Sequence, residues 1–187
     1  GQSGTMNGTA PTPVTALKNA TDPVIAIIGN PNTGKSTLFN ALTGLRQKTA
    51  NYPGVTVERH TGHIKLDGHN VTLVDLPGAY SIAAQSPDEM VAIDVLLGHV
   101  EDLPRPRAIL AVVDATNLRR NLFLVTQLAE LGLPMVIGLN MTDLAAAKGI
   151  EVDITALGAG LGAQVVALSA ARGNPAIARR ARSVPPV

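Results

Sequence analysis

The feature that most constrains the fold is a short loop sequence near the start of the chain, Gly29-Asn30-Pro31-Asn32-Thr33-Gly34-Lys35-Ser36. It matches the pattern G-x-x-x-x-G-K-[ST], in which glycines let the backbone wrap around a phosphate, the lysine reaches the outer phosphates and the hydroxyl ligates magnesium. A β-branched run at 24–28 precedes it, and residues 35–43 have helical apolar spacing before a terminating glycine. A strand, a phosphate-binding loop and a helix are therefore predicted, with a purely structural turn as the alternative.

The order of predicted elements indicates an α/β fold. Hydrophobic residues make up 45% of the chain and aromatic residues only 2%, so we expect a core of Val, Ile, Leu and Ala, as in buried parallel strands under helices. Further strands are predicted at 57–66, 70–74, 108–113, 135–139 and 165–168, the first two joined by the turn pair Asp67-Gly68. Further helices are predicted at 86–97, 118–129, 153–162 and 175–182. We expect a mostly parallel six-stranded sheet with one antiparallel edge strand and helices on both faces.

Charge, cysteine content and hydropathy argue against several classes of protein. A net charge of +1 gives no global basic field, so nucleic acid is not an expected partner. Without cysteine the chain has no disulfide scaffold and no thiolate zinc site. The longest apolar runs, 24–28 and 109–113, fall far short of the roughly 20 residues of a membrane span. We interpret residues 1–22 as a flexible lead-in or vector remnant, 23–182 as one domain and 183–187 as a tail.

Three further motifs follow predicted strands, where α/β sheets bind ligands. In Asp75-Leu76-Pro77-Gly78, the Asp could hold magnesium through water and the Gly N–H could meet a γ-phosphate, although the motif alone is typical of a turn. In Asn140-Met141-Thr142-Asp143, the carboxylate could accept two hydrogen bonds from guanine that adenine cannot donate, with helix capping as the alternative. In Leu168-Ser169-Ala170-Ala171, backbone N–H groups could meet guanine O6.

Taken in order, these motifs resemble the small GTPase superfamily over about residues 23–180. Three stretches are similar to the cytosolic G domain of the FeoB family of ferrous-iron transporters, which belongs to the TrmE-Era-like group. They are the phosphate-binding loop, Asn51-Tyr52-Pro53-Gly54-Val55-Thr56-Val57-Glu58, and Asp75-Leu76-Pro77-Gly78-Ala79-Tyr80-Ser81. The resemblance implies a Ras-like fold, a mobile switch I at 54–58 and a switch II at 77–85, both ordered by γ-phosphate. It implies nucleotide contacts from Gly29, Asn30, Pro31, Asn32, Thr33, Gly34, Lys35, Ser36, Thr37, Gly54, Val55, Thr56, Val57, Glu58, Asp75, Leu76, Pro77, Gly78, Asn140, Met141, Asp143, Ser169, Ala170 and Ala171.

The implied activity is magnesium-dependent hydrolysis of GTP to GDP and phosphate. The predicted magnesium ligands are Ser36, Thr56 and, through water, Asp75, and the predicted catalytic residues are Asn32, Lys35, Thr56 and Gly78. Ala79 follows Gly78, so no glutamine is available to orient water. The resemblance also implies a potassium ion, held by Asn32, that supplies charge at the transition state, with local bracing of the loop as the alternative role of Asn32.

The implied biological role is regulation of ferrous iron uptake through a membrane pore that this chain lacks. The resemblance places the full-length protein at the bacterial inner membrane with this domain on the cytoplasmic face, and GTP, GDP and the pore region are the expected partners. A helical regulatory segment and the membrane region are expected to lie outside the sequence. Two alternatives remain: a nucleotide sensor with negligible turnover, and an Era- or TrmE-type GTPase acting around RNA.

Overall fold

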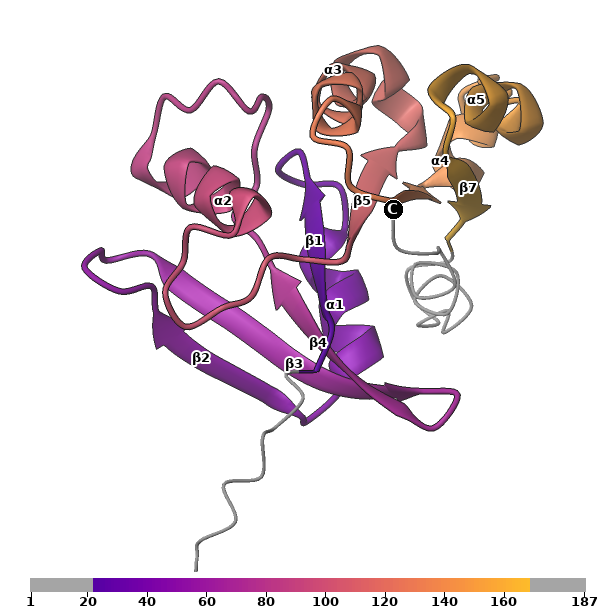
Figure 1. Ribbon diagram of the computed structural model, residues 1–187. Coiled ribbons are helices and arrows are strands. Elements are labelled where there is room, and N and C mark those ends of the chain that lie inside the picture. The colour runs from indigo at the N-terminus through magenta and orange to yellow at the C-terminus, as the bar shows by residue number, and fades with distance from the viewer. Residues whose placement is uncertain (1–21, 169–187) are drawn as a thin grey trace, which may run out of the picture.

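The computed structural model describes residues 22–168, which form one seven-stranded sheet covered by helices (Figure 1). The strand order is β2-β3-β4-β1-β5-β6-β7. The strands are β1 (Val24–Gly29), β2 (Gln47–Asn51), β3 (Glu58–Leu66), β4 (His69–Asp75), β5 (Ala108–Asp114), β6 (Met135–Asn140) and β7 (Gln164–Ala167). β4, β1, β5, β6 and β7 pair in parallel, whereas β3 is antiparallel to both β2 and β4. The predicted mostly parallel α/β architecture with an antiparallel edge region is confirmed.

The sheet has one strand more than the predicted six, because β2 forms in a stretch that its polar composition marked as loop. The residues of β2 are half-buried or exposed, so the strand has no apolar face that a sequence pattern could reveal. It forms because β3 pairs with it along its whole length, from Gln47 opposite Gly62 to Asn51 opposite Glu58. β2 is therefore the edge strand, and β3 lies one place inside it.

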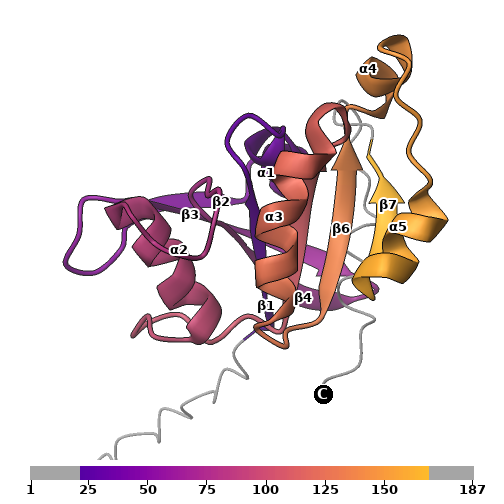
Figure 2. The ribbon, with the colours of Figure 1, turned by 90° about the horizontal axis from the view of Figure 1, so that it is seen from above.

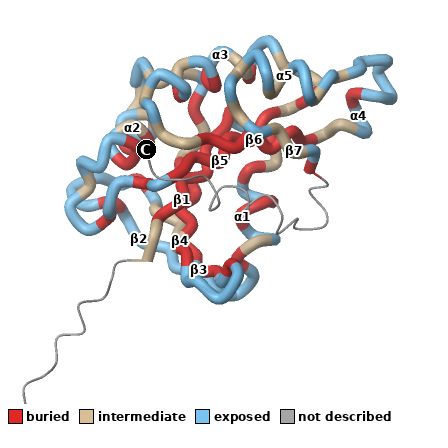
Figure 3. Tube along the Cα trace, turned by 45° about the vertical axis from the view of Figure 1, so that its right-hand side comes forward, coloured by how far each residue is buried: buried red, intermediate tan, exposed pale blue. Residues whose placement is uncertain are grey.

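Helices cover both faces of the sheet (Figure 2). α1 (Lys35–Thr43) packs on one face through Leu38 and Phe39, in a core that includes Ile25 and Ile27 of β1. α2 (Pro87–Leu97), α3 (Leu118–Ala129) and α5 (Ile154–Leu161) pack on the other face, where the alternate β1 residues point. β1 and β6 are buried along their whole length, as expected for parallel strands between two helical layers (Figure 3).

Local sequence signals account for most element boundaries. The Ser86 hydroxyl accepts a hydrogen bond from the Glu89 N–H at 3.2 Å, so α2 begins where the predicted cap places it. Asp67 and Gly68 both have positive φ, at 50° and 79°, which suits a tight hairpin between β3 and β4. Two short elements are additional to those predicted: the 3₁₀ turn η1 (Ala115–Asn117) and the helix α4 (Thr142–Ala147). The helix predicted at 175–182 lies outside the described residues.

Candidate functional site

The site lies where β1, β4 and β6 end, because parallel strands bring their carboxyl ends to the same edge of the sheet. The loop after β1 leads into α1 through Gly34, whose φ of 84° is left-handed. A Cβ at Gly34 would collide with the Asn140 side chain, whose Nδ2 donates to the Thr33 carbonyl at 2.9 Å. Close contact with the end of β6 therefore fixes the loop, and only glycine fits at this position.

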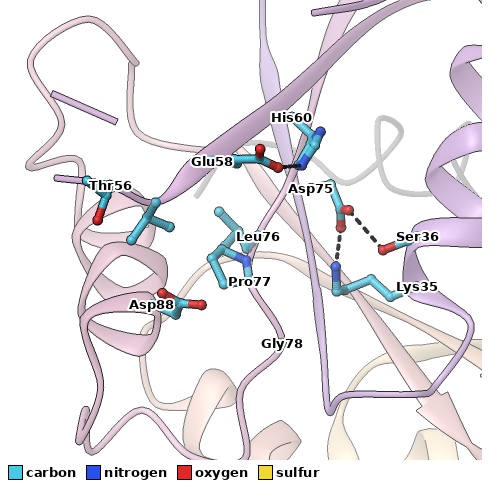
Figure 4. Close-up of a pocket in the computed structure, with 11 residues that line it drawn as sticks. Lys35, Ser36, Thr56, Glu58, His60, Asp75, Leu76, Pro77, Gly78 and Asp88 are labelled. Atoms are coloured by element: carbon cyan, nitrogen blue, oxygen red, sulfur yellow. Dashed lines mark hydrogen bonds and ion pairs between the residues drawn. The ribbon is translucent and has the colours of Figure 1, made fainter. Parts of the chain in front are cut away.

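Asp75, the last residue of β4, joins the two functional side chains at the start of α1. Its Oδ1 forms an ion pair with the Lys35 Nζ, and its Oδ2 accepts a hydrogen bond from the Ser36 hydroxyl at 3.3 Å (Figure 4). Lys35 and Asp75 are both buried. The lysine, the hydroxyl and the carboxylate predicted to serve phosphate and magnesium thus converge on one point.

Two hollows meet at this point. One, of about 400 Å³, extends from Lys35, Ser36 and Asp75 toward Thr56 and Glu58. The other, of about 510 Å³, runs along the loop crest past Asn30, Pro31, Asn32 and Thr37. Lys35, Ser36, Gly78 and Asp88 line both hollows. The space beside the helix N-terminus is therefore large enough for a polyphosphate to follow the loop.

The phosphate-binding loop carries polar atoms whose hydrogen-bonding capacity is unused within residues 22–168. Both polar atoms of the Asn30 amide and the Thr33 hydroxyl oxygen are buried there without a partner. Buried polar groups are almost always hydrogen-bonded. Asn30 lines the second hollow, so its amide lies beside any polar ligand bound there, whereas Thr33 lines neither hollow. Asn32 is exposed, with a φ of 64°, and its side chain has no hydrogen-bond partner among those residues.

The predicted switch I forms the tip of the β2–β3 ribbon. The Tyr52 N–H donates to the Val57 carbonyl at 2.9 Å, and Gly54 turns the loop with a φ of 77°. Tyr52 and Val57 are buried, while residues 53–56 are exposed. Thr56 lines the first hollow but lies across it from Lys35 and Ser36 (Figure 4). Thr56 therefore does not lie beside Ser36 and Asp75 in this arrangement of switch I, and the residues that flank its loop, Tyr52 and Val57, are buried in the core to which α2 contributes.

The predicted switch II is held against the phosphate-binding loop at its start and against α3 further on. The Ala79 N–H donates to the Gly29 carbonyl at 3.1 Å, and a Cβ at Gly78 would press on Pro31 at 3.1 Å. Arg120 of α3 stacks on Tyr80, 4.2 Å from the ring centroid. Ala79 is buried, so the position that follows Gly78 presents no polar group to the hollow. As predicted, residues 77–85 contain neither helix nor strand.

The two polar residues of the motif after β6, Asn140 and Asp143, differ in their surroundings. Asn140 is buried and braces the phosphate-binding loop, whereas Asp143 is exposed in the first turn of α4. Met141, with a φ of 60°, is the N-cap residue of α4, so Asp143 is not the capping residue. Ser169, Ala170 and Ala171 lie outside the described residues.

Sequence reasoning missed several residues around the first hollow. Asp88 faces both hollows from the first turn of α2. His60 Nε2 lies 3.2 Å from Glu58 Oε2 and His60 Nδ1 lies 3.3 Å from the Thr49 hydroxyl, so His60 ties the end of switch I to β2. Two-residue spacing on a strand is the signal that could have paired Glu58 with His60. Residues 22–168 contain no cluster of three or more metal-ligating side chains.

A second charged contact lies beyond Glu58. Arg59 forms two hydrogen bonds with Asp102, at 2.6 and 2.8 Å, and its guanidinium lies 5.6 Å from the Tyr52 ring centroid. The hydrogen bonds lower the pKa of the Asp102 carboxyl and raise the pKa of Arg59. Burial raises the pKa of Tyr52 to about 12, so this phenol stays neutral at ordinary pH.

Comparisons with known proteins agree on one family. The family model of ferrous iron transport protein B matches residues 23–178. The Fe(2+) transporter FeoB of Escherichia coli (strain K12) is 49% identical over 154 residues, which cover 80% of this chain and 19% of the relative. The chain thus spans about a fifth of the length of the curated relatives it matches. No helix within residues 22–168 is long and apolar enough to cross a membrane.

Comparison with solved structures identifies the same family. The cytosolic domain of L. pneumophila FeoB is 42% identical with a TM-score of 0.76, over 85% of this chain and 66% of that one. A GDP-bound mutant of the S. thermophilus FeoB G-domain is 46% identical with a TM-score of 0.78, over 85% and 60%. The G domain of the T. maritima FeoB iron transporter is 35% identical with a TM-score of 0.72, over 81% and 90%. With its Ras-like sheet and phosphate-binding loop, this chain is an N-terminal G domain and belongs to the FeoB family of ferrous iron transport proteins.

Proposed function

We propose that this domain binds GTP and GDP, hydrolyses GTP to GDP and phosphate, and acts as a nucleotide-dependent switch for ferrous iron uptake. The observation that carries the proposal is the convergence of Lys35, Ser36 and Asp75 at the mouth of two hollows beside the α1 N-terminus. A lysine, a hydroxyl and a carboxylate in this arrangement are what phosphoryl transfer in phosphate-binding-loop enzymes requires.

Magnesium fits the oxygen donors present. Ser36 would ligate it directly, Asp75 through water, and Thr56 once switch I approaches the phosphates. When bound, magnesium neutralises charge on the phosphate oxygens. Lys35, now paired with Asp75, would bind the outer phosphates, and the backbone N–H groups of residues 29–36 would bind the others.

A group other than a glutamine must orient the attacking water, since the residue after Gly78 is Ala79, whose side chain is a buried methyl group. We assign placement of the attacking water to the backbone of the two switches, with the Gly78 N–H directed at the γ-phosphate. Potassium held by the Asn32 side-chain oxygen would supply the charge that an arginine finger supplies in related enzymes. The lack of a hydrogen-bond partner for that side chain within residues 22–168 favours a ligand role over loop bracing.

Guanine would be recognised at the β6 end of the site. Asp143 would accept from the base, while Asn140 holds the phosphate-binding loop at the correct distance. The Met141 side chain would cover the ring, and the backbone of residues 169–171 would complete the pocket.

Transport itself belongs to the longer protein. The curated relatives are named Fe(2+) transporters and extend well beyond the matched region. We assign this domain to the cytoplasmic face of the inner membrane, where its nucleotide state would be sensed by the pore region of the same protein. The family assignment gives no support to the RNA-associated alternative.

Single-turnover phosphate release tests the proposal and separates an enzyme from a sensor. GTP mixed with excess protein and magnesium should release phosphate, and addition of a chelator should stop it. Binding of GTP without phosphate release would leave only a sensing role. Failure to bind GTP, or equal binding of ATP, would contradict the assignment of the site.

A further inference from the structure

The switch I tip is carried on a ribbon that extends beyond the sheet. β3 pairs with β4 only as far as His60, opposite Asp75, whereas its pairing with β2 continues to Glu58. At Glu58 and Arg59 the ribbon is thus two strands wide, and Figure 1 shows it extending beneath α2. Two-stranded ribbons are marginally stable alone, so side-chain contacts decide where the tip lies.

Arg59 makes two of these contacts. It holds both Asp102 carboxylate oxygens, and Asp102 belongs to the loop that follows α2. The same guanidinium lies over Tyr52, which is 3% exposed and packs in the core with Val91 and Val95 of α2. Arg59 therefore connects both ends of the switch I loop to the α2 side of the molecule.

This connection favours an open arrangement of the site. Thr56 lies three residues before Arg59 and sits across the first hollow from Ser36. To ligate magnesium beside Ser36, Thr56 must leave the α2 side. Any contact that holds the ribbon tip against α2 opposes that movement.

We infer that Arg59, through Asp102 and Tyr52, is a positioning residue that holds switch I in its open arrangement and so lowers the affinity of the domain for GTP relative to its affinity for GDP. The inference rests on the proposed function. A GTP analogue that needs Thr56 binds more weakly when the closed arrangement is rarely populated, because its apparent affinity is the affinity for the closed arrangement multiplied by the fraction of molecules in that arrangement. GDP, which lacks the γ-phosphate, does not depend on closure.

Asp102→Asn is the decisive variant, because it weakens the ion pair and leaves Arg59 over Tyr52. Partly exposed pairs contribute up to about 1 kcal/mol, so we expect GppNHp affinity to rise about threefold to fivefold while GDP affinity stays within error. Glu101→Gln is the matched control, because Glu101 is an exposed neighbour in the same loop and Arg59 forms its ion pair with Asp102 instead. Raising the salt concentration should shrink the difference.

Exchanged charges test the pair itself. Arg59→Asp should also favour GppNHp, and combining it with Asp102→Arg should return the affinity ratio toward that of the unaltered protein. The inference is overturned if Asp102→Asn matches Glu101→Gln, if GDP and GppNHp change equally, or if the exchanged pair folds but restores nothing. Failure of the unaltered domain to bind either nucleotide would instead contradict the proposed function.

Discussion

Both carboxylate oxygens of Asp75 are held by the start of α1, one by the Lys35 ammonium and the other by the Ser36 hydroxyl. Lys35 is buried, and a buried ammonium without a counter-charge would be costly. Asp75, the last residue of β4, supplies that counter-charge and holds the Lys35 side chain in place. The proposed phosphate site is thus preorganised by an ion pair, and both of its members are residues to which we assign a role in nucleotide binding.

Asp75→Asn should lower the free energy of unfolding by about 3 kcal/mol, because it leaves Lys35 buried without a counter-charge. Replacing both partners, as Lys35→Met with Asp75→Leu, should recover most of that stability without restoring GTP hydrolysis. Urea denaturation and phosphate release measure the two effects, with Glu101→Gln as an exposed acidic control. A double variant no more stable than Asp75→Asn would show that the ion pair is not the cause.

Thr56→Ala should slow GTP hydrolysis while GDP affinity barely changes, since the proposed contacts of Thr56 involve magnesium and the γ-phosphate. Stability should change by less than about 0.5 kcal/mol because residues 53–56 are exposed. Fluorescent GDP and GTP analogues give the affinities, and Val55→Ala is the neighbouring control. Equal weakening of both nucleotides with unchanged turnover would remove Thr56 from the switch role.

Asp143→Asn should weaken GTP and GDP alike, by roughly tenfold or more, because the carboxylate would no longer accept from both guanine donors. ATP should bind poorly to the unaltered protein, since adenine would leave the carboxylate without a partner. Competition titrations with GTP, GDP and ATP measure this selectivity. If ATP competes as well as GTP, Asp143 does not select guanine over adenine.

Potassium should stimulate hydrolysis more than sodium or caesium at matched ionic strength. Asn32→Ala should abolish the potassium-specific rate while nucleotide binding persists, because the Asn32 side-chain oxygen is proposed to bind the potassium ion rather than the phosphates. Turnover in the three chlorides, with and without the substitution, provides the measurement. Equal rates in all three salts would exclude a potassium role.

Tyr52 should titrate at about pH 12 in the folded protein, against roughly 10 when unfolded, because burial disfavours the phenolate. The folded state holds this proton more tightly, so its stabilising contribution is complete below pH 10 and is lost as pH rises through about 12. Tyr80→Phe leaves Tyr52 as the only tyrosine, and its near-ultraviolet absorbance reports the phenolate. A midpoint near 10 with the fold intact would contradict the burial of this hydroxyl.

The sequence by itself determined the elements that depend on local rules. The glycine loop before α1, the hairpin at Asp67-Gly68 and the cap at Ser86 all depend on short-range geometry, and each lies where the sequence predicted it. The order of the motifs likewise predicted the parallel sheet and the edge at which the site lies. In these regions residue type, spacing and backbone preference agree.

Tertiary structure decided what depends on partners far away in the chain. β2 has no apolar face and exists because β3 pairs with it. Arg59 and Asp102 are 43 residues apart, and Asn140 reaches back 107 residues to Thr33. The position of Thr56 follows from how the ribbon tip packs beside α2, which no local spacing encodes. Contacts of this kind form only once the chain has folded, because they depend on the packing of whole elements rather than on the sequence around each residue.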